Sequence, residues 1–113
     1  MIALEDIQVL NRSVIIIIPR QPFFEWVNSL DPENPMTSEN FTERTAYLIK
    51  VTDNLESAVK KQYAIIFESE LNGMWTDPND WPKDRSFNVF KEWFTWHIGS
   101  LVFDLEKGPI VKS

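Results

Sequence analysis

The sequence predicts an α+β fold, or a small α/β fold, with about three strands in a sheet packed with helices. Three observations lead to this expectation. The consecutive β-branched residues of Val14–Ile18 are typical of a strand. Apolar residues recur at helical spacing on both sides of a second strand-like segment. The stretch from Met74 to Leu105 holds four of the five tryptophans, which favours a core built largely of aromatic rings.

The first strand and the first helix are predicted between Val14 and Leu30. The run Val14–Ile18 has no polar alternation, so we expect a central strand with both faces buried. Pro22 suits the first turn of a helix, because its missing N–H is no loss there. Asp31-Pro32 ends this helix, since the residue before a proline avoids helical geometry. The apolar stripe of the helix is Phe23, Trp26, Val27 and Leu30.

A second strand, Thr45–Val51, follows a polar connection over residues 31–44. The strand, helix and strand would then form a right-handed β-α-β crossover, so the two strands are expected to be parallel. Lys50 points away from the apolar side of the second strand, which places this strand nearer an edge of the sheet.

A second helix is predicted to begin at Asp53, which forms a capping box with Glu56. It continues to about Asn72, and Gly73 is expected to be its left-handed C-terminal cap. Its inward-facing residues are predicted to be Leu55, Val59, Tyr63 and Ile66.

The last third of the chain is predicted as a turn-rich loop, a third helix and a closing strand. The helix begins near Asp84 or Ser86, and Gly99 is expected to break it before a strand over Leu101–Leu105. On a helical wheel its apolar residues cover more than half of the circumference, so it should be buried on most sides. They are Phe87, Val89, Phe90, Trp93, Phe94 and Trp96.

Composition excludes several classes of function. A formal net charge of −6 disfavours nucleic acid and anionic membrane surfaces as partners. The absence of cysteine excludes disulfides, thiolate metal sites and cysteine nucleophiles. The longest aliphatic run, Val14–Ile18, is too short to span a bilayer, and the N-terminal stretch lacks the positive charge of a secretory signal. We therefore expect one domain over residues 1–113, soluble and cytoplasmic.

Catalytic groups are sparse. His97 is the only histidine, and with Ser100 and Asp104 it supplies the residue types of a nucleophile triad. No Gly-x-Ser-x-Gly elbow accompanies them, so a structural or surface role is favoured for His97. Glu92 would become a general acid only if it were buried, and its place on the polar strip of the third helix argues for solvation.

No cofactor and no metal are expected. Asp77, Asp80 and Asp84 could be imagined as oxygen ligands, but their spacing does not match a calcium-binding loop. Acidic residues in a proline-rich turn mostly hold turns and cap helices. The three glycines, at 73, 99 and 108, form neither a phosphate-binding loop nor a dinucleotide fingerprint.

The aromatic residues have two interpretations. In the first, Phe90, Phe94 and Trp93 simply fill the core. In the second, three tryptophans rim a groove and Arg85 sits between the loop and the helix, since tryptophan and arginine are enriched at binding hot spots. The groove would bind another protein or, as the less favoured alternative, stack a small planar or sugar ligand. These candidate binding residues are Trp75, Trp81, Arg85 and Trp96.

A distinctive pattern spans most of the chain from residue 13 onward: Pro22-Phe23, Trp26, Trp75-Thr76-Asp77, Trp81-Pro82, Arg85, Phe90, Glu92-Trp93-Phe94 and Ser100 to Leu105. In this pattern the chain resembles a small bacterial family of hypothetical proteins. The resemblance implies one bacterial cytosolic domain and carries no activity with it. Members of that family often have a histidine just before the serine, where this chain has Gly99. That departure weakens a mechanism centred on a histidine.

Two classes of function follow. The first is a non-enzymatic interaction module that binds a protein partner or forms a homodimer through the loop Trp75–Arg85 and the exposed edge of the aromatic helix. The alternative is a small hydrolase or ligand-binding protein that uses His97, Asp104 and Glu92. The acidic charge would also suit an inhibitor of a basic protein.

Overall fold

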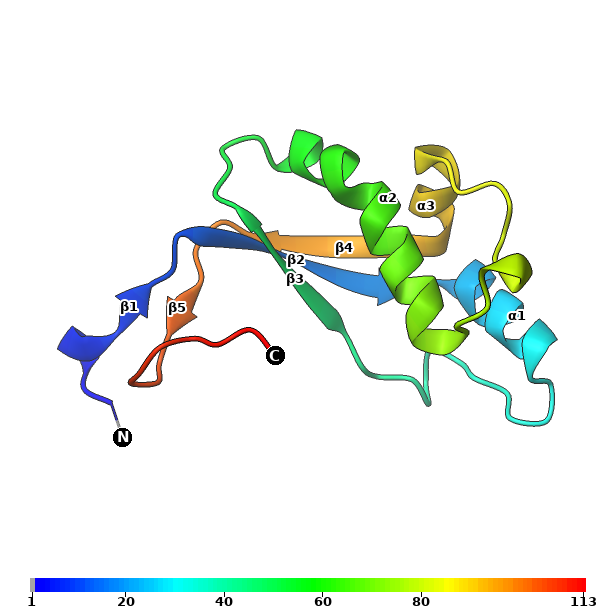
Figure 1. The fold of residues 1–113 in the computed structure, drawn as a ribbon, viewed down its shortest axis with the longest axis horizontal. Coiled ribbons are helices and arrows are strands. Elements are labelled where there is room, and N and C mark those ends of the chain that lie inside the picture. Colours follow the sequence, from blue (N-terminus) through cyan, green and yellow to red (C-terminus); the bar gives the residue numbers. More distant parts are fainter. Residues whose placement is uncertain (1) are drawn as a thin grey trace.

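The structure, a computed structural model, describes residues 2–113 (Figure 1). A three-stranded sheet has the order β3-β2-β4, and a two-stranded ribbon is formed by β1 and β5. The strands are β1 (Gln8–Val9), β2 (Arg12–Pro19), β3 (Thr45–Lys50), β4 (Phe94–Gly99) and β5 (Phe103–Asp104). The helices are α1 (Gln21–Leu30), α2 (Leu55–Met74) and α3 (Phe87–Trp93), with short 3-10 turns η1 (Leu4–Asp6) and η2 (Pro78–Asp80). The α+β expectation is confirmed.

The β-branched run forms the central strand β2, as predicted, but only one face of it is covered. Ile15 and Ile17 are fully buried in one core with residues of all three α-helices, whereas Ile16 on the opposite face is only half-buried. The expectation that both faces would be buried was wrong. It failed because α1, α2 and α3 all contribute to the same core, which leaves the other face of the sheet without a helix.

The strands of the sheet are antiparallel. Ile15 of β2 lies opposite Tyr47 of β3 on one side and opposite Ile98 of β4 on the other. The predicted parallel β-α-β crossover was therefore wrong. The connection over residues 31–44 allows the chain to return beside β2 in the reverse direction, so the handedness rule for parallel strands does not apply. The expected edge position of the second strand is confirmed, because β3 pairs only with β2.

The predicted aromatic helix is half helix and half strand. The helix α3 ends at Trp93, and Phe94–Gly99 is the edge strand β4. Phe94, Trp96 and Ile98 turn toward the helices, while Thr95 and His97 lie on the other face. This period of two is a strand signal that the helical wheel concealed. The expected closing strand at 101–105 is reduced to Phe103–Asp104, and it lies outside the main sheet.

The observed ends of α1 and α2 can be compared with the ends predicted from capping residues, proline and glycine. The first helix follows its prediction within one residue. The second is capped by Asn54 rather than Asp53, since the Asn54 side chain accepts a hydrogen bond from Ser57 N at 3.1 Å. Gly73 was expected to be a left-handed cap but lies inside α2, and its φ is not positive. Only Gly108 among the described glycines has the positive φ, 96°, that favours glycine.

Phenylalanine rings dominate the core. Phe94 lies between Phe23, Phe67 and Phe90, with ring centroids 5.4, 5.5 and 5.1 Å away. All four rings are buried, and edge-to-face or tilted contacts at these distances add to the stabilisation from burial. The core role predicted for Phe90 and Phe94 is confirmed, and Trp93 is half-buried at its margin.

The molecule is elongated, with extents of 50 × 31 × 25 Å. The ribbon of β1 and β5 projects from one end of the sheet, as an extension of β2 and β4 (Figure 1). We call residues 2–10 and 101–105 the arm. Within residues 2–113, no helix has the length and apolar character needed to cross a membrane.

Candidate functional site

Three indole N–H groups donate hydrogen bonds to acceptors in the loop after α2. Trp81 Nε1 donates to the Trp75 carbonyl at 2.7 Å, and Trp75 Nε1 donates to Asp80 Oδ2 at 2.9 Å. Trp26 of α1 donates to the Asp80 carbonyl at 3.0 Å. The predicted binding residues Trp75 and Trp81 therefore hold the loop in its own conformation, and Trp26 joins the loop to α1.

Arg85, the third predicted binding residue, closes the same loop. It donates to the Pro82 carbonyl at 2.7 Å, and its guanidinium lies 5.8 Å from the Trp81 ring centroid, within cation–π range. It is also 4.0 Å from Glu68 of α2. Since this ion pair is partly exposed, we attribute little stability to it. The structure thus brings Trp75, Trp81 and Arg85 together, in contacts that hold the loop.

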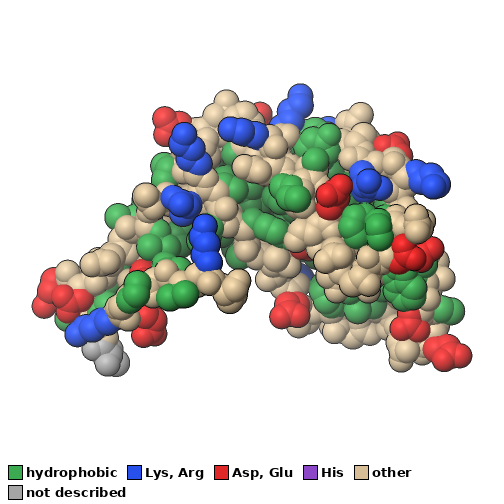
Figure 2. Space-filling view, viewed as in Figure 1, with side chains coloured by type: hydrophobic (Ala, Val, Ile, Leu, Met, Phe, Trp, Pro, Cys, Tyr) green, Lys and Arg blue, Asp and Glu red, His purple; other side chains and the backbone are tan. Residues whose placement is uncertain are grey.

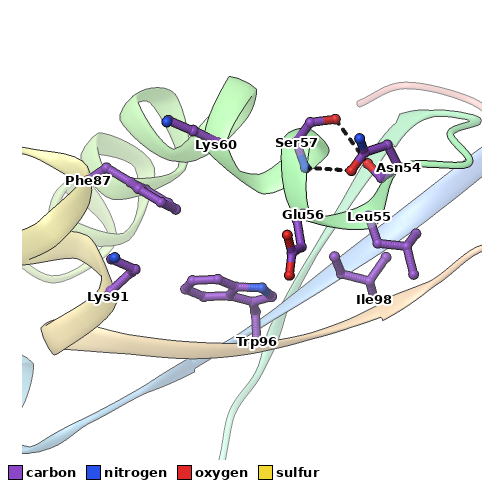
Figure 3. Close-up of a pocket in the computed structure, with 9 residues that line it drawn as sticks. All are labelled: Asn54, Leu55, Glu56, Ser57, Lys60, Phe87, Lys91, Trp96 and Ile98. Carbon is purple, nitrogen blue, oxygen red and sulfur yellow. Dashed lines mark hydrogen bonds between the residues drawn. The ribbon is translucent and has the colours of Figure 1, made fainter.

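Trp96, the fourth predicted binding residue, lies elsewhere, in a cleft between the start of α2, α3 and β4 (Figure 3). Its ring is 5.4 Å from Phe90 and 6.5 Å from Phe87, measured between centroids. The four predicted residues therefore belong to two different places in the fold.

The cleft has a volume of about 610 Å³ and an aromatic and aliphatic floor. Lys60 and Lys91 reach it from two helices, and Glu56 lies above Trp96 (Figure 3). Lys91 Nζ is 5.1 Å from the centroid of Phe87. These charged residues could not be grouped from the sequence, because they lie on two helices that are far apart in the chain. The cleft lining is Asn54, Leu55, Glu56, Ser57, Lys60, Phe87, Lys91, Trp96 and Ile98.

The candidate catalytic residues do not meet. His97 is exposed on β4 opposite Ile16. Asp104, seven residues later in the chain, lies in the arm opposite Gln8. Glu92 is exposed on α3. Within residues 2–113, no hydrogen bond or ion pair joins any two of His97, Asp104 and Glu92.

The acidic residues of the loop have structural roles. Asp77 Oδ1 accepts from Asn79 N at 3.0 Å, which caps the turn η2, and Asp84 Oδ1 accepts from Ser86 N at 3.1 Å. Among the residues that the structure describes, no group of three or more His, Cys, Asp and Glu is placed to hold a metal ion.

One polar pair is partly buried between the sheet and α2. The Tyr47 hydroxyl donates to Glu70 and lies 2.9 Å from Ser69 Oγ. Burial raises the pKa of Glu70 above its ordinary value of 4.5, and the hydrogen bond from Tyr47 opposes that rise. Burial, followed by the hydrogen bond to Glu70, raises the pKa of the Tyr47 hydroxyl. The pair joins β3 to α2 and faces no enclosed reaction site.

The face of the sheet opposite the helices, which we call the open face, is apolar at its centre. Ile16 is flanked by Ala46 on β3 and His97 on β4, and Leu48 lies opposite Val14 with 51% of its surface exposed. An uncovered apolar patch of this kind marks an interaction site in soluble proteins. The open face comprises Arg12, Val14, Ile16, Ile18, Ala46, Leu48, Lys50, Thr95 and His97.

The arm is also apolar and unsupported. Val9 lies opposite Phe103 in the antiparallel pair, and Leu10 N donates to the Val102 carbonyl at 2.7 Å. Both Val9 and Phe103 are more than half exposed, at 56% and 55%. Figure 2 shows the arm projecting from the body with hydrophobic side chains on its surface. An isolated two-stranded ribbon is marginal in water, so the arm needs a surface to pack against.

Comparison with protein-family models, with curated proteins and with solved structures gives no match to this chain.

Proposed function

We propose that this protein is a non-enzymatic interaction module of the bacterial cytosol, and that it binds a protein partner through the open face of its sheet. One observation carries the proposal. The central strand β2 leaves a row of aliphatic side chains partly exposed on the face opposite the helices. Covering apolar surface supplies roughly 25 cal/mol per Å², so such a face is a ready source of binding energy.

The location of the surface differs from the sequence-based hypothesis. The loop Trp75–Arg85 was expected to bind the partner, but its indole donors and its guanidinium already have partners within the chain. On the open face, by contrast, Leu48 of β3 keeps 51% of its surface exposed. The absence of cysteine is compatible with the reducing cytosol that the proposal assigns to the protein.

The hydrolase alternative has less support. A general acid, base or nucleophile has to lie within hydrogen-bond reach of its partner groups. His97, Asp104 and Glu92 come from β4, the arm and α3, and no contact joins them. Within this alternative, ligand binding in the cleft beside Trp96 has more support than hydrolysis, because aromatic side chains and two lysines line that cleft.

The open face is tested by a matched pair of charge substitutions, Leu48→Glu on β3 and Ile65→Glu on α2. The two leucine-sized side chains are exposed to a similar extent, 51% and 61%, but only Leu48 belongs to the open face. The readouts are fluorescence of an apolar dye such as bis-ANS at nanomolar protein and sedimentation at micromolar protein. Dyes of this type bind exposed apolar surface.

We expect the native protein to bind the dye, to associate, or to do both. Leu48→Glu should reduce these signals at least fivefold, because a carboxylate on the apolar face must be desolvated when the face is covered. Ile65→Glu should leave them within a factor of two. A native protein that neither binds dye nor associates, or two variants that behave alike, would contradict the proposal.

A further inference from the structure

The surface of the chain is too large for a self-sufficient monomer. A folded monomer of 13.3 kDa is expected to expose about 6,450 Å². This chain exposes 8240 Å², an excess of about 1,800 Å². Its radius of gyration is 16.5 Å, against about 13 Å for a compact domain of its length. If two chains each removed that excess, the total would fall in the range of obligate homodimers, which bury roughly 2,000–5,000 Å².

The arm and the open face both carry exposed apolar side chains, such as Val9, Phe103 and Leu48, and the two surfaces are similar in length. The sheet strand β2 has eight residues, which at about 3.3 Å per residue gives about 26 Å. The arm projects from the same end of β2 and β4 and is about 17 Å long from Leu4 to Leu10, at about 2.0 Å per residue in η1 and 3.3 Å beyond it. An arm laid on the open face of another chain would therefore cover most of that face.

The two surfaces are also complementary in charge. The arm carries three carboxylates, of Glu5, Asp6 and Asp104, and no lysine or arginine. The open face carries no carboxylate, and its Arg12 and Lys50 lie directly opposite each other across β2 and β3. Like charges in that position repel, so an acidic partner would relieve them. The chain as a whole has a net charge of −6, so a face whose charged side chains are basic differs in sign from the rest of the molecule.

The other segment of this chain that could cover the open face is its own C-terminal tail, residues 106–113. This tail is exposed throughout, and Ile110 and Val111 leave most of their surface in solvent. Leu48 on the face, and Val9 and Phe103 on the arm, are each more than half exposed, so these side chains are available for contact with another molecule.

Resting on the proposed function, we infer that the partner is a second copy of this chain, and that the arm of each copy lies on the open face of the other. Such an exchange is isologous: the contact of arm with face occurs twice about a two-fold axis and then closes. The closed dimer would cover the aliphatic row of β2 and the apolar residues of both arms. It would also give the two-stranded ribbon of each arm the packing surface that it lacks in isolation.

The first test locates the arm by disulfide cross-linking. Because the chain has no cysteine, the introduced cysteines are the only ones that can form a disulfide. Two differently tagged chains are co-expressed, one with Val9→Cys and the other with Leu48→Cys, and are then mildly oxidised. We expect a disulfide between the two chains in a large fraction of the material, measured by intact mass. In the control, Ile65→Cys replaces Leu48→Cys, and the yield should fall at least tenfold because Ile65 lies on α2.

The second test is the strength of the dimer, measured by sedimentation equilibrium of the full chain. We expect a species of twice 13.3 kDa at micromolar concentration. Val9→Glu on the arm and Leu48→Glu on the face should each raise the dissociation constant at least tenfold, while Ile65→Glu should not. Val9 is outside the core, so its substitution does not threaten folding. Raising the salt concentration should weaken the dimer, since the charges of arm and face attract.

The outcomes separate this inference from the proposed function. A monomer at every concentration whose dye binding is lost on Leu48→Glu would overturn the second copy and leave the binding face intact. A dimer that Leu48→Glu weakens but Val9→Glu does not, without the Val9–Leu48 disulfide, would overturn the arm exchange. A dimer indifferent to Leu48→Glu, with no dye binding by the native chain, would overturn both.

Discussion

At the residue scale, Gly73 weakens the end of α2. It lies in the last turn of a 20-residue helix, its φ is not positive, and a Cβ built on it would meet nothing within 4 Å. A glycine in such a position loses more backbone entropy on folding than alanine does. Gly73→Ala is therefore expected to raise the free energy of unfolding by about 0.5–1 kcal/mol, measured by urea denaturation.

Gly108 is the matched control. Its φ of 96° is one that L-residues rarely adopt, so Gly108→Ala should not stabilise the protein although a Cβ there also meets nothing within 4 Å. Equal gains from the two substitutions would show that the backbone conformation of Gly73 is not the helical one described.

At the element scale, Tyr47 and Glu70 couple the edge strand β3 to α2. The Tyr47 hydroxyl donates to the Glu70 carboxylate, and both side chains are half-buried. Tyr47→Phe should lower the free energy of unfolding by about 1 kcal/mol, because it removes one hydrogen bond and leaves the carboxylate with fewer donors.

The raised pKa of Glu70 gives the same pair a pH dependence with a definite sign. The folded state favours the protonated form of Glu70 more than the unfolded state does. The stabilisation linked to Glu70 is then fully present below pH 4.5 and is lost as the pH rises through the raised folded-state pKa. Glu70→Gln keeps an acceptor for Tyr47 but cannot ionise. The stability of this variant relative to the native protein should increase over that interval, and a constant difference would contradict the assignment.

The elements that the sequence predicted well are those with local signals. Pro22 and Asp31-Pro32 mark both ends of α1, and the run Val14–Ile18 marks the central strand, because such preferences act within a few residues. The direction of β3 was predicted wrongly because it depends on how a 14-residue connection returns over the sheet, and no local preference encodes that.

The segment Phe94–Gly99 was predicted wrongly for a different reason. Large aromatic residues occur at both helical and strand spacing there, since Phe90, Phe94 and Trp96 satisfy a helical wheel while Phe94, Trp96 and Ile98 alternate. Hydrogen-bonded pairing with β2 selects the strand conformation over the helix. The open face that we propose as the binding surface could not be predicted from the sequence either, because a run of aliphatic residues does not show which of its two faces the helices will cover.

At the scale of the whole molecule, the two sides of the sheet differ: one side packs against the aromatic core, and the other is the open face. Rings from α1, α2, α3 and β4 fill one side of the sheet and make a core that needs no partner. The other side of the sheet and the arm retain apolar surface that a monomer of this size would normally bury. The residues that form the core are therefore a different set from those of the proposed association surface.

This division predicts that stability depends on protein concentration. In a dimer that dissociates as it unfolds, each tenfold increase in concentration adds about 1.4 kcal/mol per dimer, which for two 113-residue chains raises the melting temperature by about 3 °C. Differential scanning calorimetry between micromolar and millimolar protein measures this shift. Leu48→Glu should remove the dependence while leaving a cooperative transition, because Leu48 contributes nothing to the aromatic core. A native melting temperature that is constant over this range would show that the fold is complete in one chain, and the excess surface would then have to serve a different partner.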